Sequence, residues 1–185
     1  MQINSSQYQL FQEAFRQYYQ PLCQYAFTLV KEPHACEDIV QEIFLRVWEK
    51  KQELVGTEAL RYYLYTAVRN NCLTHLEKMK KTAVTSLTGD ETMTPEETAP
   101  ERKPETDFNA LVATALERLP PKCREVFVMS RLSRLTYQQV ADTLGISVKT
   151  VENQMGKALK IMRAFVKENQ LFIVLLILFI SFMAH

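Results

Sequence analysis

The chain has 185 residues, of which 47% are hydrophobic and 23% are charged, and its formal net charge is +1. This composition is that of a folded chain, and the length allows one domain or two small ones with a buried core. A net charge so close to zero argues against a protein that binds nucleic acid through its overall charge.

The fold class follows from the glycine content and the spacing of apolar residues. The chain holds only 4 glycines, and no segment alternates apolar and polar residues as a half-buried strand does. Many windows instead place apolar residues three to four positions apart, which is the helical pattern. The sequence therefore predicts an all-α protein.

The cysteines indicate a reducing compartment. Cys23, Cys36, Cys72 and Cys123 stand far apart without a C-x-x-C pair, and residues 1–10 lack the basic start and apolar run of a secretory signal. We expect a cytoplasmic protein whose four thiols serve as small buried hydrophobic groups.

Residues 11–48 carry apolar side chains at helical spacing and contain two prolines. Pro21 and Pro33 are expected to mark helix boundaries, because proline lacks the backbone N–H that a helix interior requires. The sequence thus predicts an N-terminal helical bundle.

One helix of this bundle, with the sequence ACEDIVQEIFLRVWEK, has a distinctive surface. Asp38, Gln41 and Glu42 fall on one face, and Phe44 and Trp48 lie one turn apart. A charged face beside exposed aromatic side chains is typical of a surface that binds another protein.

After a loop at 51–59, residues 60–81 interleave basic residues with Tyr62, Tyr63 and Tyr65. Aromatic rings can stack on bases, Lys and Arg can follow phosphates, and Asn70 or Asn71 can hydrogen-bond a base edge, which suits single-stranded or melted nucleic acid. Tyrosines half-buried in a helix bundle with a solvated basic end would give the same pattern, so both interpretations stay open.

Residues 82–106 are rich in Thr, Pro and Glu and almost free of large apolar residues, which predicts a flexible linker. This linker holds six acidic and two basic residues. By contrast, residues 61–81 hold five basic residues and one acidic residue, and residues 107–185 hold ten basic and six acidic residues. The near-neutral total therefore hides two basic segments.

Boundary signals divide the C-terminal part into short helices. The Pro-Pro pair at 120–121 suits the first turn of a helix, and Thr136 with Gln139 is expected to form a capping box at the start of another. Gly145 can take the left-handed conformation that ends this helix, and Ser147 can cap the next one.

These two helices, joined at a glycine, predict a helix-turn-helix whose second helix lies in a DNA major groove. The expected buried residues are Val140, Ala141, Leu144, Val148, Val151, Met155, Ala158, Leu159 and Met162. The opposite face offers lysines for phosphates, Asn153 for adenine and Glu152 for a cytosine amino group. A helical hairpin with a solvated face is the alternative.

The tail at 167–185 ends in LFIVLLILFISFMAH. Its apolar run of fourteen residues would span about 21 Å as a helix, short of the ~30 Å hydrocarbon core of a bilayer. We expect an apolar helix that packs on the protein's own domains, docks on a partner or a second copy, or anchors shallowly in a membrane. Our hypothesis is that the tail masks part of the DNA-binding unit or is itself masked.

Four motifs together resemble the extracytoplasmic-function (ECF) group of the sigma-70 family, the sigma factors of bacterial RNA polymerase. They are EDIVQEIFLRVWEK, YLYTAVRNN, RLPPKCREVF and LTYQQVADTLGISVKTVENQMGKALK, in the family's order on either side of a linker. The resemblance implies two helical domains, sigma region 2 at 6–81 and region 4 at 107–166. It implies a subunit that binds core polymerase and recognises the minus-10 and minus-35 promoter elements.

The resemblance also implies roles for individual residues. Core polymerase would be bound by Asp38, Gln41, Glu42, Phe44 and Trp48. The melted non-template strand of the minus-10 element would be bound by Tyr63, Tyr65, Arg69, Asn70, Asn71 and Lys78, with a flipped base at Asn70 beside the loop 51–59. The minus-35 duplex would be read by Ser147, Lys149, Thr150, Glu152, Asn153, Gly156, Lys157 and Lys160.

Two positions depart from the family pattern. Tyr63 stands where many members have Trp, and Gly156 replaces a larger residue on the reading helix. The family usually has an anti-sigma factor as a further partner.

The sequence raises two other classes of function. A stand-alone helix-turn-helix regulator with an N-terminal sensing or dimerisation domain is the second interpretation. A nuclease using Glu37, Asp38 and Glu42 as metal ligands is not expected, because no phosphate loop or nucleophile motif accompanies them and His34, His75 and His185 are too scattered for a zinc site. We therefore predict no enzyme activity and no cofactor.

Overall fold

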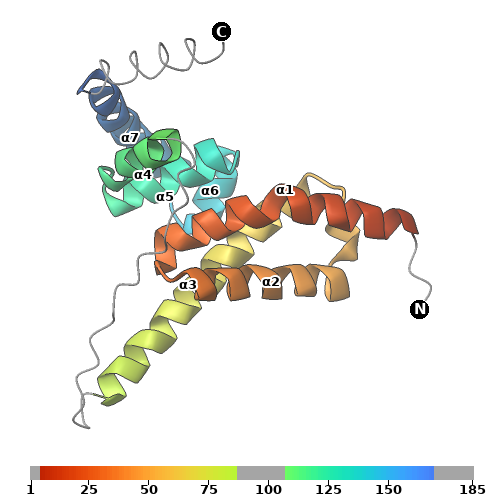
Figure 1. Ribbon diagram of the computed structural model, residues 1–185. Coiled ribbons are helices and arrows are strands. Elements are labelled where there is room, and N and C mark those ends of the chain that lie inside the picture. The colour runs from red at the N-terminus through yellow and green to blue at the C-terminus, as the bar shows by residue number, and fades with distance from the viewer. Residues whose placement is uncertain (1–4, 87–106, 169–185) are drawn as a thin grey trace. The chain divides into compact units, whose positions relative to one another are not determined.

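Residues 5–86 and 107–168 are described by the structure, which is a computed structural model. The chain divides into two compact units after residue 97, and each unit is treated by itself. Within the described ranges the regular elements are all helical (Figure 1). The all-α prediction is confirmed.

The first unit is a bundle of three long helices. They are α1 (Ser5–Val30), α2 (Pro33–Lys50) and α3 (Ala59–Ser86), with a single 3-10 turn, η1 (Gln52–Leu54), between α2 and α3. Each pair of these helices is in contact. Their shared core is aliphatic and includes Leu22 and Ala26 of α1, Val40, Ile43 and Val47 of α2, and Leu64, Val68 and Cys72 of α3.

The prediction that Pro21 ends a helix is wrong, because α1 continues through it. Proline removes one backbone hydrogen bond inside a helix, yet the residues that follow lie in the bundle core: Leu22, Tyr25 and Ala26 are all buried. The burial of this face offsets the lost bond, while Pro21 itself is exposed.

Pro33 does mark a boundary, as predicted. It occupies the first turn of α2, where its missing N–H costs nothing. The preceding residue, Glu32, caps the helix by accepting a hydrogen bond from the Ala35 N–H at 3.0 Å.

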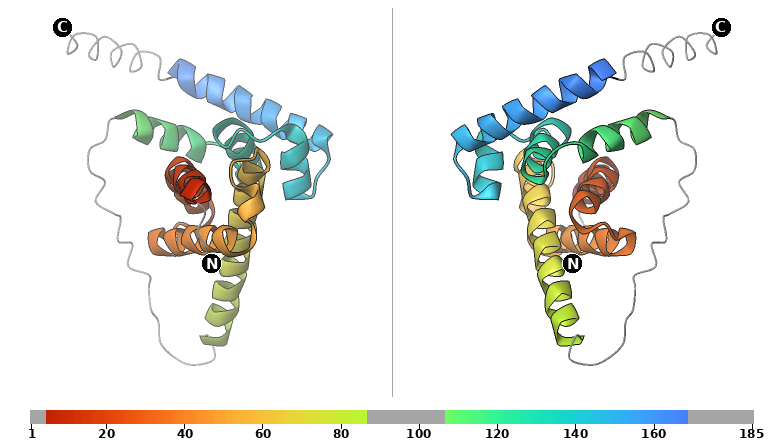
Figure 2. Two further views of the ribbon diagram at one scale, coloured as in Figure 1. Left: turned by 90° about the vertical axis from the view of Figure 1, so that its right-hand side faces the viewer. Right: turned by 90° about the vertical axis from the view of Figure 1, so that its left-hand side faces the viewer.

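Helix α3 extends well beyond the bundle. Figures 1 and 2 show its C-terminal part projecting past α1 and α2. Leu73, Lys78 and Met79 on this projection are exposed, whereas Leu64 and Val68 nearer the start of α3 are fully buried. The projecting part therefore carries a basic, largely solvent-facing surface.

The second unit contains α4 (Asp107–Glu117), α5 (Pro121–Phe127), the π-helical segment η2 (Val128–Leu132), α6 (Tyr137–Leu144) and α7 (Val148–Glu168). Helix α7 packs on both α5 and α6. The fully buried side chains of this unit include Leu119, Val126, Met129, Val140, Val151, Met155 and Ala158.

Arg124 fixes the connection between α4 and α5. Its guanidinium donates to the backbone carbonyls of Leu116, Glu117 and Leu119 at 2.8, 2.9 and 3.2 Å. These carbonyls belong to the end of α4 and the residues after it, where the Leu116 carbonyl also accepts from the Leu119 N–H at 3.1 Å. A charged donor shared by three backbone carbonyls holds the turn before Pro120 in place.

All four cysteines are free thiols, and three of them are buried. Burial raises the pKa of Cys36 to about 11 and that of Cys72 to about 12. Cys123 lies in the second core and donates to Oε1 of Gln154 at 2.9 Å. The prediction that these thiols serve as small buried groups is confirmed for Cys36, Cys72 and Cys123, whereas Cys23 is half-buried.

The predicted linker at 82–106 and the apolar tail at 167–185 lie largely outside the described residues. Helix α3 runs to Ser86 and α4 begins at Asp107. Among the helices of the described ranges, none is long and apolar enough to cross a membrane.

Candidate nucleic-acid interface

The turn between α6 and α7 is held by local backbone interactions. Gly145 adopts the left-handed conformation at φ 64°, and its N–H bonds to the carbonyl of Ala141. The Ile146 N–H reaches the same carbonyl at 3.1 Å. The predicted capping box between Thr136 and Gln139 is also present at the start of α6.

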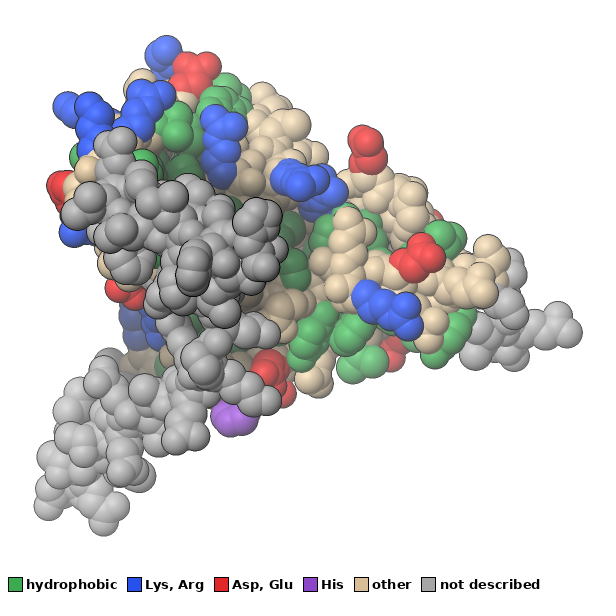
Figure 3. Space-filling view, turned by 45° about the horizontal axis from the view of Figure 1, so that its top comes forward, with side chains coloured by type: hydrophobic (Ala, Val, Ile, Leu, Met, Phe, Trp, Pro, Cys, Tyr) green, Lys and Arg blue, Asp and Glu red, His purple; other side chains and the backbone are tan. Residues whose placement is uncertain are grey.

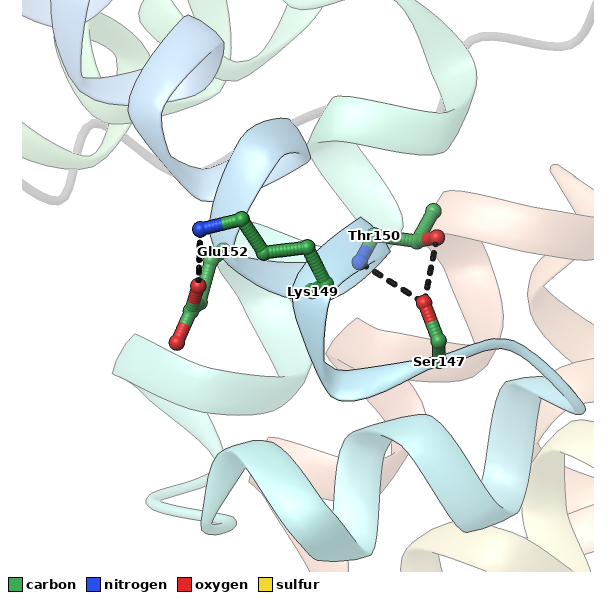
Figure 4. Close-up of polar contacts among 4 residues, drawn as sticks. All are labelled: Ser147, Lys149, Thr150 and Glu152. Carbon is green, nitrogen blue, oxygen red and sulfur yellow. Dashed lines mark hydrogen bonds and ion pairs between the residues drawn. The ribbon is translucent and has the colours of Figure 1, made fainter.

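Ser147 caps α7, as predicted. Its Oγ accepts a hydrogen bond from the Thr150 N–H at 3.1 Å and lies 2.8 Å from Oγ1 of Thr150 (Figure 4). The side-chain oxygens of both residues are thus engaged in ordering the first turn of α7. Their local role is to fix the angle at which α7 leaves the turn.

Beside this cap, Lys149 and Glu152 form an ion pair with Nζ and Oε2 3.0 Å apart (Figure 4). Their side chains are 79% and 46% exposed, so solvent screens the pair and it adds little stability. Either side chain can therefore leave its partner for another ligand at low cost.

The rest of the predicted reading face is open to solvent. Asn153, Gly156, Lys157 and Lys160 are all exposed, whereas Val151, Met155 and Ala158 on the opposite side of α7 are buried. Blue Lys and Arg side chains gather on this C-terminal unit in Figure 3. Helix α7 thus presents a polar, basic face of the kind that enters a major groove.

A second concave surface lies in the first unit, beside α3. It is a pocket of about 530 Å³ lined by Arg46, Lys51, Leu54, Ala59, Tyr62, Tyr63, Thr66, Ala67, Asn70 and Asn71. The pocket brings together the loop after α2 and the Tyr and Asn residues of α3 that the sequence singled out. Nδ2 of Asn71 is buried there and has no hydrogen-bond partner among the described residues.

Three other residues predicted for this surface do not line the pocket. Tyr65 is only 4% exposed and packs against Tyr25 with ring centroids 5.5 Å apart, so it belongs to the bundle core. It stands three residues before the fully buried Val68, on the same side of α3. Lys78 is exposed on the projecting part of α3 and does not line the pocket, and Arg69 is half-buried.

The outer face of α2 carries Asp38, Gln41 and Glu42, all exposed as predicted. Glu42 pairs with Arg46 at 2.8 Å, and Gln41 donates to the Tyr19 hydroxyl at 3.3 Å. Because Arg46 also lines the pocket, the acidic face and the pocket are neighbouring parts of one surface.

The expected exposure of Phe44 is wrong, since its ring is only 3% exposed. Phe44 packs against Phe11 and Phe15 of α1, and Trp48, which is half-buried, packs against Phe11. These aromatic rings pack between α1 and α2. The aromatic surface that the sequence predicted for binding another protein is therefore used largely in packing α1 against α2.

The apolar residue that α2 does expose is Leu45, which is 61% exposed. It lies three residues after Glu42 and four after Gln41, on the same outer face. Leu45 was not predicted from the sequence, although an apolar residue at an otherwise polar helical position is a signal for such a surface. Leu45 gives this otherwise polar face an exposed apolar centre.

No three His, Cys, Asp or Glu side chains of the described ranges come together in a way that could hold a metal ion. Glu37, Asp38 and Glu42 are exposed on α2 without such a grouping.

Comparison with known proteins identifies the family. The family model described as Sigma-70 region 2 matches residues 14–82, and the one described as Sigma-70, region 4 matches residues 110–162. The ECF RNA polymerase sigma factor SigL of Mycobacterium tuberculosis is 30% identical over 149 residues, which cover 80% of this chain and 83% of SigL. This chain belongs to the ECF sigma factors. The resemblance drawn from the sequence is confirmed.

Other sigma factors resemble it to a similar degree. The ferric citrate uptake sigma factor FecI of Escherichia coli is 30% identical over 129 residues, covering 67% of this chain and 72% of FecI. The solved sigma factor RpoE, in complex with the anti-sigma factor NepR from Bartonella quintana, has a TM-score of 0.61 at 20% identity and covers 85% of this chain and 96% of RpoE. CnrH, solved in complex with the cytosolic domain of CnrY, has a TM-score of 0.53 at 22% identity. The match covers 86% of this chain and 88% of CnrH. These two structures share the fold of this sigma factor.

We predict separable effects for two exposed residues on α7 of this sigma factor. Asn153→Ala should relax preference at a single base pair of the upstream promoter element, at a cost of about 1–3 kcal/mol for the preferred base. Lys157→Ala should weaken binding to all upstream sequences alike and lower the salt dependence of log affinity by about one unit of slope. Titration of each holoenzyme against promoter variants at several salt concentrations measures both. The same response of the two variants across all promoters would contradict these roles.

Proposed function

We propose that this sigma factor is a subunit of RNA polymerase that binds the promoter at two separate elements, through sigma region 2 at 6–81 and region 4 at 107–166. The observation that supports the proposal is the presence of two candidate binding surfaces in separate units: the pocket beside α3 and the exposed face of α7. The first suits an unstacked base, and the second suits a duplex groove.

The acidic outer face of α2 is the proposed docking site for core polymerase. Asp38, Gln41 and Glu42 offer charge and hydrogen bonds, and Leu45 offers exposed apolar area at their centre. A buried apolar anchor within a polar rim is the usual composition of a protein interface. Trp48, which is half-buried at the edge of this face, stays a proposed contact with core polymerase. Phe44 is buried beneath the face and would contribute only through packing.

The pocket beside α3 is the proposed site of a flipped base from the non-template strand of the minus-10 element. Its volume of about 530 Å³ exceeds that of one nucleobase, and Tyr62 and Tyr63 supply aromatic surface for stacking. Asn70, which is exposed, would hydrogen-bond the base edge, and Lys51 would pair with a phosphate. Asn71 lines the pocket beside Asn70, with its own Nδ2 atom buried. Arg69 and Lys78 are proposed to follow the strand along α3.

The exposed face of α7 is the proposed reader of the minus-35 duplex. Lys149, Lys157 and Lys160 would bind phosphates, while Glu152 and Asn153 would read base edges. Ser147 and Thr150 order the first turn of α7 through the hydrogen bond between the Thr150 N–H and Ser147 Oγ. Their proposed contact with DNA comes in addition to this structural role. The acidic segment at 82–106 would connect the two units across the polymerase.

We propose that the chain supplies no chemistry of its own and acts in the cytoplasm, where the polymerase and its template are found. An anti-sigma protein is a proposed partner, supported by the complex in which the sigma factor RpoE was solved with the anti-sigma factor NepR. The outer face of α2 is exposed and would be available to such a competitor.

The direct test is run-off transcription with purified core polymerase. The full chain should convert core enzyme from non-specific to promoter-dependent initiation on a genomic template library, and it should yield no specific transcripts without core. If specific DNA binding is equally strong with and without core, and transcription does not change, the chain is instead a stand-alone helix-turn-helix regulator.

We predict that Leu45→Asp weakens core binding by about 2 kcal/mol, roughly thirtyfold, because it places a charge at the apolar centre of the interface. The side chain is 61% exposed, so folding should not change. Met79→Asp is the matched control, since Met79 is 59% exposed on the projecting part of α3. Binding to core without DNA, measured by fluorescence anisotropy, should weaken only for the first variant. Equal affinities of the two variants for core polymerase would show that Leu45 is not part of the interface.

A further inference from the structure

The C-terminal end of α7 carries a stripe of basic side chains. Lys160, Arg163 and Lys167 follow one another at intervals of three and four residues, which places them on one side of the helix, and all three are exposed. Arg163 and Lys167 lie beyond the residues proposed to read the minus-35 duplex. The basic stripe therefore extends past the part of α7 that the proposed function uses.

The nearest acidic residue is held away from this stripe. Glu168 is the only acidic residue between 153 and 185. Its carboxylate forms an ion pair with Arg118 of α4, and the Arg118 guanidinium also lies over the Phe165 ring, 5.1 Å from the centroid. Glu168 thus faces α4, and the basic stripe keeps its positive charge.

An apolar stripe runs beside the basic one. It consists of Leu159, Met162 and Val166, which have the same helical spacing one position earlier. Met162 packs on the core of the unit, Leu159 is half-buried and Val166 is 50% exposed. Cationic and apolar side chains therefore adjoin at the end of α7, a combination that is typical of helices at a membrane surface.

The apolar run at 171–184 begins four residues after Lys167 and contains one polar residue, Ser181. Because it is apolar on every side, it needs an apolar surrounding and not a single apolar face. The apolar stripe of α7 could cover only one side of it, whereas lipid hydrocarbon surrounds it completely. Even as a helix the run would reach about 21 Å, so it can enter a bilayer without crossing it.

The charge of α7 distinguishes a lipid surface from a second copy of the chain. Packing two such runs together would also bring two basic stripes near each other, and like charges repel. An anionic lipid surface attracts the same stripe, and each Lys or Arg close to such a surface strengthens binding about fivefold. The observations therefore favour lipid.

We infer that residues 171–184 and the basic stripe of Lys160, Arg163 and Lys167 together form a binding site for an anionic membrane surface. The run enters the hydrocarbon, and the stripe selects negatively charged headgroups. Lys160 is also proposed to bind a promoter phosphate, so lipid and duplex should compete for α7. This competition rests on the proposed function, whereas membrane binding itself does not.

The test is flotation of the full-length chain with lipid vesicles. One set of vesicles is phosphatidylcholine alone, and the other contains about one quarter of the anionic lipid phosphatidylglycerol. Three variants are compared with the wild type: Arg163→Gln with Lys167→Gln, Leu178→Asp, and Lys122→Gln with Arg131→Gln. The last is the matched control, because it removes two exposed charges elsewhere in the same unit.

The wild type should bind the anionic vesicles about a hundredfold more tightly than the neutral ones. Arg163→Gln with Lys167→Gln should reduce this preference about twentyfold, while the matched control keeps it. Leu178→Asp should abolish binding to both kinds of vesicle. A wild type that stays off the vesicles, as a monomer or a dimer in sedimentation, would overturn the inference. Equal binding of the wild type and Arg163→Gln with Lys167→Gln to anionic vesicles would overturn the role of the stripe.

A second measurement tests the competition. Anionic vesicles should lower the affinity of the holoenzyme for a promoter duplex, and Leu178→Asp should remove this effect. Vesicles that bind the holoenzyme without changing its affinity for the duplex would contradict a shared surface. If the holoenzyme binds no promoter duplex even without vesicles, the proposed function fails, and flotation still decides whether the chain binds membranes.

Discussion

Both units depend on one constraint: a helix that buries a single stripe of side chains presents its opposite face to solvent in a fixed direction. In α7 the buried stripe is Val151, Met155 and Ala158, and the turn at Gly145 with the Ser147 cap fixes where this stripe begins. In α2 the burial of Ile43 and Val47 leaves Gln41, Glu42 and Leu45 outside. The faces proposed to bind DNA and polymerase are positioned by the cores beneath them.

The small overall charge fits this arrangement. The basic residues are concentrated where α3 projects and along the exposed stripe of α7, whereas acidic residues lie on the outer face of α2 and in the segment 82–106. Phosphate contacts supply most of the affinity of DNA-binding proteins, so a local basic surface matters more than the sum over the chain. The faces proposed to bind DNA, on α3 and α7, are therefore basic, whereas the face of α2 proposed to bind polymerase is acidic.

Much of the fold was predictable because its signals are local. The capping box at Thr136, the left-handed Gly145 and the Ser147 cap each depend on residues within one turn, and each was confirmed. Long-range packing decided what local signals did not. Pro21 lies inside α1 because the residues after it are needed in the core, and Phe44 and Tyr65 are buried because partners on α1 receive their rings.

The candidate sites show the same division. The polar face of α7 could be predicted from helical periodicity alone, whereas the pocket beside α3 combines residues from α2, the following loop and α3 that only tertiary structure brings together. Leu45 could not be placed by periodicity alone, because an apolar residue in an amphipathic helix is by default expected on the buried side, whereas the packing of α2 leaves Leu45 outside. Such exceptions become visible once the core has been assigned.

The central claim is that the two units bind the minus-10 and minus-35 elements of one promoter at the same time, at a spacing set by the polymerase. Its most direct test is holoenzyme affinity for promoters whose minus-10 and minus-35 elements are separated by about five additional base pairs, half a helical turn. The account predicts that affinity falls to that of a promoter with a single element, and that the free chain is insensitive to the change. Holoenzyme that binds both promoters equally well would contradict it.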